Sequence, residues 1–411
     1  MKVLLSAYAC EPGKGSEPGM GWHWALEIAR LGHEVWILTR NNNLSGLERA
    51  LTSHADLKIH LVGYDLPPWL RWWKRGGRGV YAYYSLWQFG ACHAARRLAL
   101  ETPFDLVHHI TFAGFRQPSF MGRLGIPFVL GPTGGGESTP SLLLQSYPLR
   151  GQVVDAARAL ANRFARFDPL VRQSFEQAAV ILCKTKDTLS YVPPEHRAKC
   201  IMMQDVGTEM SLISQAAPAN PQTARFLYVG RLLYWKGVHL ALQALARMRQ
   251  DYPGATLTIV GKGPDREWLC QLASQLGVAH AVEWKGWVPR EEVLSIYREH
   301  TAFLFPSLHD SGGTVVMEAL SQGLPVICLD TGGPGAMLPS SCGFKVAVED
   351  RTQAEVVNDL AAAMQQIAEN PGLGAEMARC SLAAAYENTW SKIVSRTYQH
   401  IQDVCLAPQS K

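Results

Sequence analysis

Short apolar runs alternate with longer stretches of helical periodicity along almost the whole chain. This alternation is typical of β–α–β units, which build parallel sheets. A helix over Gly21–Leu31, ending at Gly32, illustrates the connecting segments. In the first half the predicted strands are Val3–Ala7, Glu34–Thr39, Lys58–Val62, Asp105–Ile110, Pro127–Leu130, Val180–Cys183 and Lys199–Met203.

A polar, proline-containing segment, Ser214–Gln222, interrupts this rhythm and predicts a linker. The alternation resumes at Arg225, and the chain from Arg351 onward is predicted to be helical. The second set of predicted strands is Arg225–Val229, Thr256–Val260, Ala281–Lys285, Ala302–Phe305, Pro325–Leu329 and Phe344–Val346. The predicted helices include Val238–Arg249, Asp265–Leu276, Glu291–Glu299 and Thr314–Gln322.

A chain of 411 residues exceeds a single hydrophobic core, so two domains are expected. We predict one doubly wound α/β domain over residues 1–210 and a second over residues 223–387. Ligands of such sheets bind beyond the carboxyl ends of the strands. The sequence therefore predicts a site in a cleft between the two domains.

The composition, 47% hydrophobic and 18% charged, is that of a soluble globular enzyme. A net charge of +4 is too small to argue for nucleic acid as a partner. Nine scattered cysteines with no C-x-x-C pair favour a reducing cytoplasm over a disulfide framework or a zinc site. The apolar start, residues 3–10, resembles a short lipoprotein signal, but a buried first strand fits better because a helix pattern follows at once.

The segment His309–Leu320 carries the most specific chemistry. Its small-residue turn, Ser311-Gly312-Gly313, leads into an apolar helix at Thr314. Unpaired N–H groups and the helix dipole at such a turn favour a phosphate. Carboxylates at Asp310 and Glu318 accept hydrogen bonds from hydroxyls, so the segment suits a sugar nucleotide. The alternative is an N-cap aspartate followed by an ordinary helix glutamate.

Two cations follow the first strand of the second half. Arg231 lies just past the strand and Lys236 lies at the start of the next helix. They could neutralise the charge that grows on a diphosphate leaving group, or they could be solvated surface charges. Gly261 and Gly263 follow the next strand, where a lone G-x-G is a weak signal and usually a tight turn.

The order and spacing of several blocks resemble glycosyltransferase family 4, a family of retaining enzymes with the GT-B fold. Several such blocks in one order are far more specific than any one of them. The blocks are VGR-x4-KG (Val229–Gly237), IVGKGP (Ile259–Pro264), KGWVP (Lys285–Pro289), FPSLHD (Phe305–Asp310), MEAL-x2-GLPVI (Met317–Ile327) and TGGP (Thr331–Pro334).

This resemblance implies roles for individual positions. Arg231 and Lys236 fall on the diphosphate-binding pair of the family. Glu318 falls on the second acid of its E-x7-E motif, which holds the ribose. Asp310 falls on the first acid, which contacts hydroxyls of the transferred sugar. The family usually has glutamate there, followed by Phe-Gly, so the shorter carboxylate leaves the identity of the donor sugar open.

The resemblance extends to the first domain. Glu11–Gly21 is similar to the glycine-rich first loop of the family, in which Gly19 and Gly21 would lie against the donor; a flexible surface loop is the alternative. The strand Asp105–Ile110 resembles the one that ends in an active-site histidine. Alternation places His108 and His109 on opposite faces, and His109 is favoured.

Three further expectations concern the last helix, a glycine-rich loop and the need for a metal or cofactor. Residues 388–411 resemble the last helix of the family, which packs back on the first domain. Residues 130–138 look superficially like a P-loop, but Glu137 occupies the position of the P-loop lysine. ATP binding is therefore not expected. We expect this segment to be a loop that lines the acceptor cleft. No D-x-D motif occurs, and no metal or cofactor is expected.

Aromatic and basic residues interleave early in the chain, between residues 65 and 100. This composition fits an anionic membrane surface, and acceptors of the family are often lipid-linked. The alternative is that the aromatics line the acceptor cleft. The residues concerned are Trp69, Trp72, Trp73, Lys74, Arg75 and Arg78.

Together with the candidate site residues, the resemblance implies a retaining hexosyltransferase that uses a UDP- or GDP-sugar. Its expected acceptor is a saccharide or lipid-linked saccharide in cell-surface polysaccharide synthesis. The expected location is the cytoplasm, with peripheral contact at the inner face of the membrane. A nucleotide-sugar epimerase and a non-catalytic sugar-nucleotide-binding subunit remain as alternatives.

Overall fold

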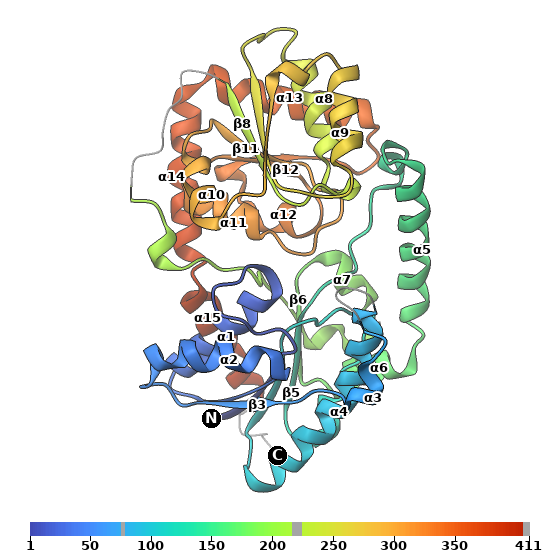
Figure 1. The fold of residues 1–411 in the computed structure, drawn as a ribbon, viewed down its shortest axis with the longest axis vertical. Helices are drawn as coiled ribbons and strands as arrows, with labels where there is room; N and C mark the ends of the chain where they lie inside the picture. The colour runs from blue at the N-terminus through green and yellow to red at the C-terminus, as the bar shows by residue number, and fades with distance from the viewer. Residues whose placement is uncertain (75–78, 216–223, 406–411) are drawn as a thin grey trace. The chain divides into compact units, whose positions relative to one another are not determined.

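The computed structural model describes residues 1–74, 79–215 and 224–405. The chain forms two compact units. The first comprises residues 1–136, 161–205 and 390–411, and the second comprises residues 137–160 and 206–389. Each contains one parallel sheet, of seven and six strands respectively (Figure 1). The predicted pair of doubly wound α/β domains is confirmed.

The sheet of the first unit has the order β3-β2-β1-β4-β5-β6-β7. Its central strand β1 is apolar and buried on both faces, as a parallel sheet covered by helices requires. Val3 packs in a cluster with α1, α2 and α15, whereas Leu4 packs with α4 and α6 on the other face. The strands are β1 Lys2–Ser6, β2 Glu34–Thr39, β3 Ile59–Gly63, β4 Leu106–His109, β5 Phe128–Thr133, β6 Val180–Cys183 and β7 Cys200–Met202. The helices are α1 Ser16–Arg30, α2 Asn41–Leu51, α3 Pro68–Arg71, α4 Val80–Glu101, α5 Leu149–Ala165, α6 Pro169–Gln177, α7 Lys186–Tyr191 and α15 Trp390–Cys405, of which α5 begins in the second unit.

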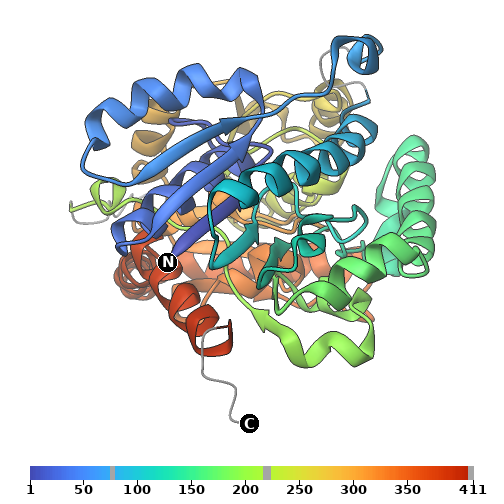
Figure 2. The same ribbon diagram turned by 90° about the horizontal axis from the view of Figure 1, so that it is seen from below.

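Helix α15 closes one face of the first unit. Trp390 stacks on His23 of α1 with ring centroids 5.0 Å apart, and Tyr398 is fully buried in the same cluster. The beginning of the chain lies beside this helix, shown in red in Figure 2. The last helix is therefore part of the first unit, and residues 406–411 lie outside the described part of the chain.

The sheet of the second unit has the order β10-β9-β8-β11-β12-β13, with β8 and β11 in the middle. Phe303 and Leu304 of β11 are completely buried, which again reflects helices on both faces. The strands are β8 Arg225–Val229, β9 Thr256–Val260, β10 Val282–Gly286, β11 Ala302–Phe305, β12 Val326–Leu329 and β13 Gly343–Val346. The helices are α8 Val238–Met248, α9 Arg266–Gln275, α10 Arg290–Arg298, α11 Thr314–Ser321, α12 Gly332–Met337, α13 Gln353–Glu369 and α14 Pro371–Glu387.

Residues 137–160 differ from the sequence-based domain boundaries, which placed them in the first domain. They belong to the second unit, and Leu143 and Tyr147 are buried in its core. Tyr147 packs edge-on against Tyr234 at 4.7 Å and bonds Thr139 through its hydroxyl at 2.7 Å. Of the predicted linker Ser214–Gln222, residues 216–222 lie outside the described residues.

Helix α1 begins at Ser16, five residues before the predicted start. Gly19 and Gly21 therefore lie in the helix rather than in a loop. A Cβ atom on Gly19 would lie 1.9 Å from the Lys14 carbonyl oxygen, and one on Gly21 would lie 2.4 Å from that of Ala9. Glycine is needed at both positions for close approach of the backbone, not for a left-handed conformation.

Candidate functional site

Lys236 and Asp310 form an ion pair beyond the carboxyl ends of β8 and β11. The tight turn after β8 makes this possible. Gly237 has a φ of +72°, and a Cβ there would lie 1.7 Å from the Pro306 carbonyl oxygen. Only glycine lets the two loops approach this closely. The ammonium group also lies 5.4 Å from the centre of the Phe305 ring, and both paired side chains remain partly exposed.

The turn before α11 is supported from below by the glycines of α12. Gly333 donates its N–H to the Asp310 carbonyl oxygen at 2.6 Å, and a Cβ on Gly332 would lie 2.4 Å from that oxygen. The helix begins at Thr314, with Gly313 at its N-cap. The alternative reading of Asp310 as the N-cap is therefore wrong. The first-turn N–H groups of any helix lack partners within it, so this turn can receive an anion.

Glu318 lies one turn into α11, and its side chain is 15% exposed. Its Oε1 is 3.4 Å from Nε of Arg290, and its Oε2 accepts a hydrogen bond from the Tyr297 hydroxyl at 3.4 Å. Burial raises the pKa of the Glu318 carboxyl, and the guanidinium opposes this shift only in part. The sequence did not reveal Arg290 and Tyr297, although Arg290 directly follows the KGWVP block.

Arg231 and the glycines Gly261 and Gly263 lie at the same edge of the second sheet. The Arg231 side chain is exposed, and its carbonyl oxygen accepts the Tyr228 hydroxyl at 3.2 Å. A Cβ on Gly261 would lie 1.9 Å from the Gly230 oxygen, and one on Gly263 would lie 2.1 Å from the Leu232 oxygen. These glycines hold the β8 and β9 loops together, which accords with a tight turn.

The segment 137–160 adds two buried acids to this edge. Glu137 is completely buried and accepts a hydrogen bond from the Ser311 hydroxyl. Asp155 lies 3.2 Å from Nε2 of His309, whose ring stacks on Trp235 at 5.4 Å. No sequence signal pointed to these pairs, because their members are more than 150 residues apart.

A buried charge cluster supports the start of α1 in the first unit. Glu17 accepts the Phe112 N–H at 2.9 Å and lies 3.3 Å from Nζ of Lys184. Lys184 also pairs with Asp205 at 2.5 Å. Burial alone would lower the pKa of Lys184, but the two carboxylates outweigh it and raise that pKa. Ser16 and Phe112 have φ near +58°, a strained conformation that the cluster holds in place.

The two histidines of β4 point to opposite faces, as predicted. His108 bonds the Tyr398 hydroxyl at 3.0 Å and the Gly131 oxygen at 2.8 Å. His109 bonds the Tyr84 hydroxyl at 2.9 Å and the Ser119 hydroxyl at 2.7 Å. Both rings are buried, and burial lowers the pKa of each to about 4. At neutral pH both are uncharged.

These buried histidines predict acid sensitivity. Between the ordinary pKa of 6.5 and about 4, the unfolded chain takes up protons that the folded chain does not. Stability is therefore lost as the pH falls through this range, by roughly 3 kcal/mol for each ring. We expect the melting temperature of wild type to fall as the pH is lowered through this range. In His108→Asn the melting temperature should depend less steeply on pH. The exposed His93 gives the control: a flat profile in wild type, or an equal change in His93→Asn, would contradict the prediction.

The segment proposed from sequence as a membrane contact has two strongly exposed tryptophans, Trp69 and Trp72, at 70% and 76%. Trp73 is partly buried, and Lys74 lies over the Tyr83 ring at 4.8 Å. Arg75 and Arg78 lie outside the described residues. Within the described ranges, no helix is both long and apolar enough to cross a bilayer.

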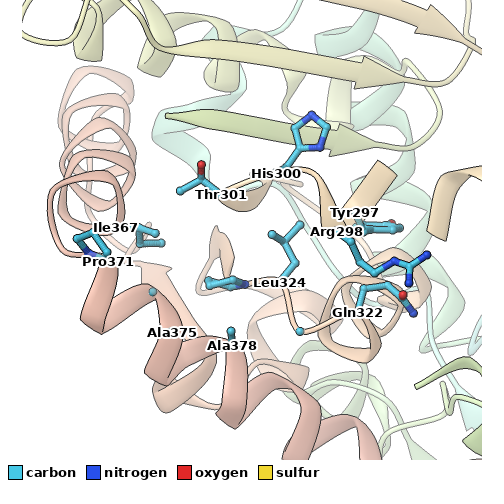
Figure 3. A pocket seen from close by; sticks show the side chains of 13 residues that line it. Tyr297, Arg298, His300, Thr301, Gln322, Leu324, Ile367, Pro371, Ala375 and Ala378 are labelled. Atoms are coloured by element: carbon cyan, nitrogen blue, oxygen red, sulfur yellow. The ribbon is translucent and has the colours of Figure 1, made fainter. Parts of the chain in front are cut away.

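A pocket that is partly open to solvent lies at the opposite, amino-terminal edge of the second sheet (Figure 3). Thr301 and Leu324, which precede β11 and β12, line it together with Arg298 and Ala378. It is therefore separate from the turn before α11. In the part of the chain that the structure describes, no group of three or more His, Cys, Asp or Glu side chains could hold a metal ion.

Comparison with known sequences gives one family match. Residues 210–380 match the family described as glycosyl transferases group 1. Glycogen synthase of Mycobacterium tuberculosis is 34% identical over 189 residues, 44% of each chain, so the match spans less than half of that enzyme. The D-inositol 3-phosphate glycosyltransferase of Corynebacterium diphtheriae is 28% identical over 93% of this chain and 88% of its own length.

Solved structures share the fold across the whole chain. A sucrose-phosphate synthase from Thermosynechococcus elongatus covers 99% of it with a TM-score of 0.67 and 16% identity. The Anabaena protein Alr3699/HepE, solved in complex with UDP, covers 98% with a TM-score of 0.61 and 15% identity. The lipopolysaccharide outer core galactosyltransferase WaaB also covers 98%, with a TM-score of 0.61. The architecture is the GT-B fold.

Proposed function

We propose, from the premise that this chain is a member of the group 1 glycosyltransferases with the GT-B fold, that it transfers a hexosyl unit from a UDP- or GDP-sugar to an acceptor hydroxyl. The proposed reaction retains the configuration of the anomeric carbon. The observation that carries the proposal is the Lys236–Asp310 pair beside the uncapped start of α11. An ammonium group, a carboxylate that can accept hydrogen bonds from hydroxyls, and a turn that can bind an anion then lie together at the carboxyl edge of the second sheet.

Each group has a chemical task in this proposal. Lys236 has three N–H donors, so it can bind a phosphate oxygen while it remains paired with Asp310. The second oxygen of Asp310 is left to accept a sugar hydroxyl. Arg231 and the N–H groups of the Ser311–Thr314 turn complete the diphosphate site, and Gly261 and Gly263 keep the adjoining loop close. Glu318 accepts hydrogen bonds from the ribose.

The chemical step exchanges one bond at the anomeric carbon for another. The bond from that carbon to the diphosphate oxygen breaks, and the acceptor oxygen bonds to the carbon on the same face. The departing oxygen takes the acceptor proton, and Lys236 and Arg231 stabilise the negative charge that grows on the diphosphate. We assign no nucleophilic carboxylate and propose that the reaction needs no metal. His109, Gly19 and Gly21 are proposed to contribute from the first unit.

The acceptor is proposed to be a glycan or lipid-linked saccharide used in cell-surface polysaccharide synthesis. Exposure of Trp69 and Trp72 supports contact with an anionic membrane surface, together with Trp73 and Lys74. The proposed location is the cytoplasmic side of that membrane. Nucleic acid is not a proposed partner.

A donor screen tests the proposal directly. Purified protein is incubated with UDP- and GDP-sugars, with and without a mixture of saccharide acceptors, and released nucleoside diphosphate is measured. Acceptor-dependent release from one donor is the expected result. A new sugar nucleotide formed without acceptor would instead identify an epimerase. Nucleotide binding without any turnover across the donor panel would identify a non-catalytic subunit.

Glu318→Ala should lower turnover about tenfold or more, because the ribose loses its hydrogen-bond acceptor in a largely buried position. The KM for the donor should rise in the same variant. Both changes are measured by steady-state kinetics, on variant protein whose melting temperature matches that of wild type. Glu376→Ala, an exposed position on α14, is the matched control. Wild-type rates in a folded Glu318→Ala protein would remove this residue from the site.

A further inference from the structure

Helix α5 has its apolar and polar faces reversed relative to an ordinary surface helix. Leu149, Val153, Leu160 and Phe164 follow one another at intervals of four, seven and four residues, which places them on one face. Their exposed fractions are 80%, 70%, 55% and 64%. Helices of soluble proteins normally bury such a face and expose the polar one.

The polar residues of the same helix point inward. Asp155 is buried beside His309, and Asn162 is buried and donates to the Gly135 carbonyl oxygen at 3.4 Å. Arg158 is 21% exposed and lies near Asp155. The helix is thus anchored through its polar side chains, and its outer face is left entirely apolar. A contiguous apolar surface of this kind marks an interaction site.

The charges that border this face all have one sign. Arg150 and Arg163 flank it, and Arg166 follows it; all three are exposed. The single acid between residues 149 and 167 is the buried Asp155. A second copy of the chain, docked symmetrically on this face, would bring arginines towards arginines. A bilayer surface with anionic headgroups would instead place apolar side chains in the acyl boundary and arginines at phosphates.

We propose that α5, together with the exposed Phe167 that follows it, is an interfacial helix that binds an anionic lipid surface. It lies parallel to the membrane plane, with the apolar face inserted and the arginines at the headgroups. This surface differs from the Trp69–Lys74 segment and nothing in the transfer reaction requires it. It therefore stands or falls independently of the proposed activity.

Flotation of the full-length protein with vesicles tests the proposal without any donor or acceptor. Vesicles of phosphatidylcholine alone are compared with vesicles that also contain phosphatidylglycerol. We expect binding to the anionic vesicles that weakens as salt is raised. The double variant Leu160→Glu with Phe164→Glu should lower vesicle partitioning at least about tenfold, because two charges would enter the acyl boundary.

Three comparisons make the test decisive. Leu100→Glu places one negative charge at another exposed leucine and should float like wild type. Arg150→Ala with Arg163→Ala should weaken binding to anionic vesicles only. The melting temperature of the Leu160→Glu, Phe164→Glu protein should match wild type, since both side chains are already exposed.

Three results would overturn the proposal. The first is wild-type flotation of the Leu160→Glu, Phe164→Glu variant. If the Trp69→Ala, Trp72→Ala variant also failed to bind, the lipid contact would be assigned to that segment instead. The second is an absence of binding to either kind of vesicle. The third is a lipid-free dimer, seen by sedimentation velocity, that the α5 variant dissociates, because the occupant would then be a second copy.

Discussion

Turnover should fall about a hundredfold in Lys236→Ala, the range seen when a single group that stabilises transition-state charge is removed. The ammonium group is paired with Asp310 at the carboxyl edge of the second sheet, so in the proposed reaction it is already placed when the diphosphate binds. In that reaction, negative charge on the diphosphate grows as its bond to the anomeric carbon breaks. The loss should therefore appear in kcat as well as in kcat/KM.

Two variants sharpen this measurement. Lys345→Ala removes a partly exposed lysine from β13 of the same sheet and should retain wild-type kinetics. Lys236→Arg keeps the charge but changes its geometry, so an intermediate rate is expected. Since Lys236 is partly exposed, its replacement should barely alter the melting temperature. A folded Lys236→Ala protein with an unchanged kcat would refute the leaving-group role.

Lys184→Met should destabilise the first unit by about 3 kcal/mol or more, because it leaves buried carboxylate charge without a partner. Asp205 is 5% exposed at its side chain and has its pKa raised by burial, with Lys184 acting against that shift. Glu17 would lose the same partner, and the strained backbone at Ser16 and Phe112 would lose support. Chemical denaturation followed by circular dichroism gives the midpoint.

The double variant Lys184→Met with Asp205→Asn separates charge from packing. It should recover part of the lost stability, because the most buried unpaired charge is removed with its partner. Lys199→Met serves as the control, because the hydrogen bond that the Lys199 ammonium group donates to the Glu176 carbonyl oxygen is exposed. Equal midpoints for Lys184→Met and Lys199→Met would show that the cluster contributes nothing to folding.

The sequence predicted the sheets well because both are buried on two faces. A strand such as Val180–Cys183 is a short apolar run with polar boundaries, and the structure has the same bounds. The start of α1 was missed for a physical reason. Gly19 and Gly21 looked like loop residues, yet they are glycines because the backbones of Lys14 and Ala9 pass too close for any side chain.

In the candidate site too, the sequence predicted residues that belong to local patterns but not the partners that the fold brings to them. Lys236, Asp310 and Glu318 could be named because they stand at strand ends or in a helix whose pattern is local. Their partners could not, since Arg290 reaches Glu318, and Glu137 reaches Ser311, only through packing between distant segments. Alternation along β4 placed His108 and His109 on opposite faces. Which of the two serves the reaction stays a prediction.

The excursion of residues 137–160 into the second unit has a consequence for chimaeras built from related enzymes. A crossover near residue 210 would take Ser311 and His309 from one parent but Glu137 and Asp155 from the other. Tyr147 would likewise meet a foreign Tyr234. Exchange of donor preference between relatives should therefore succeed only when this stretch travels with the carboxyl-terminal half.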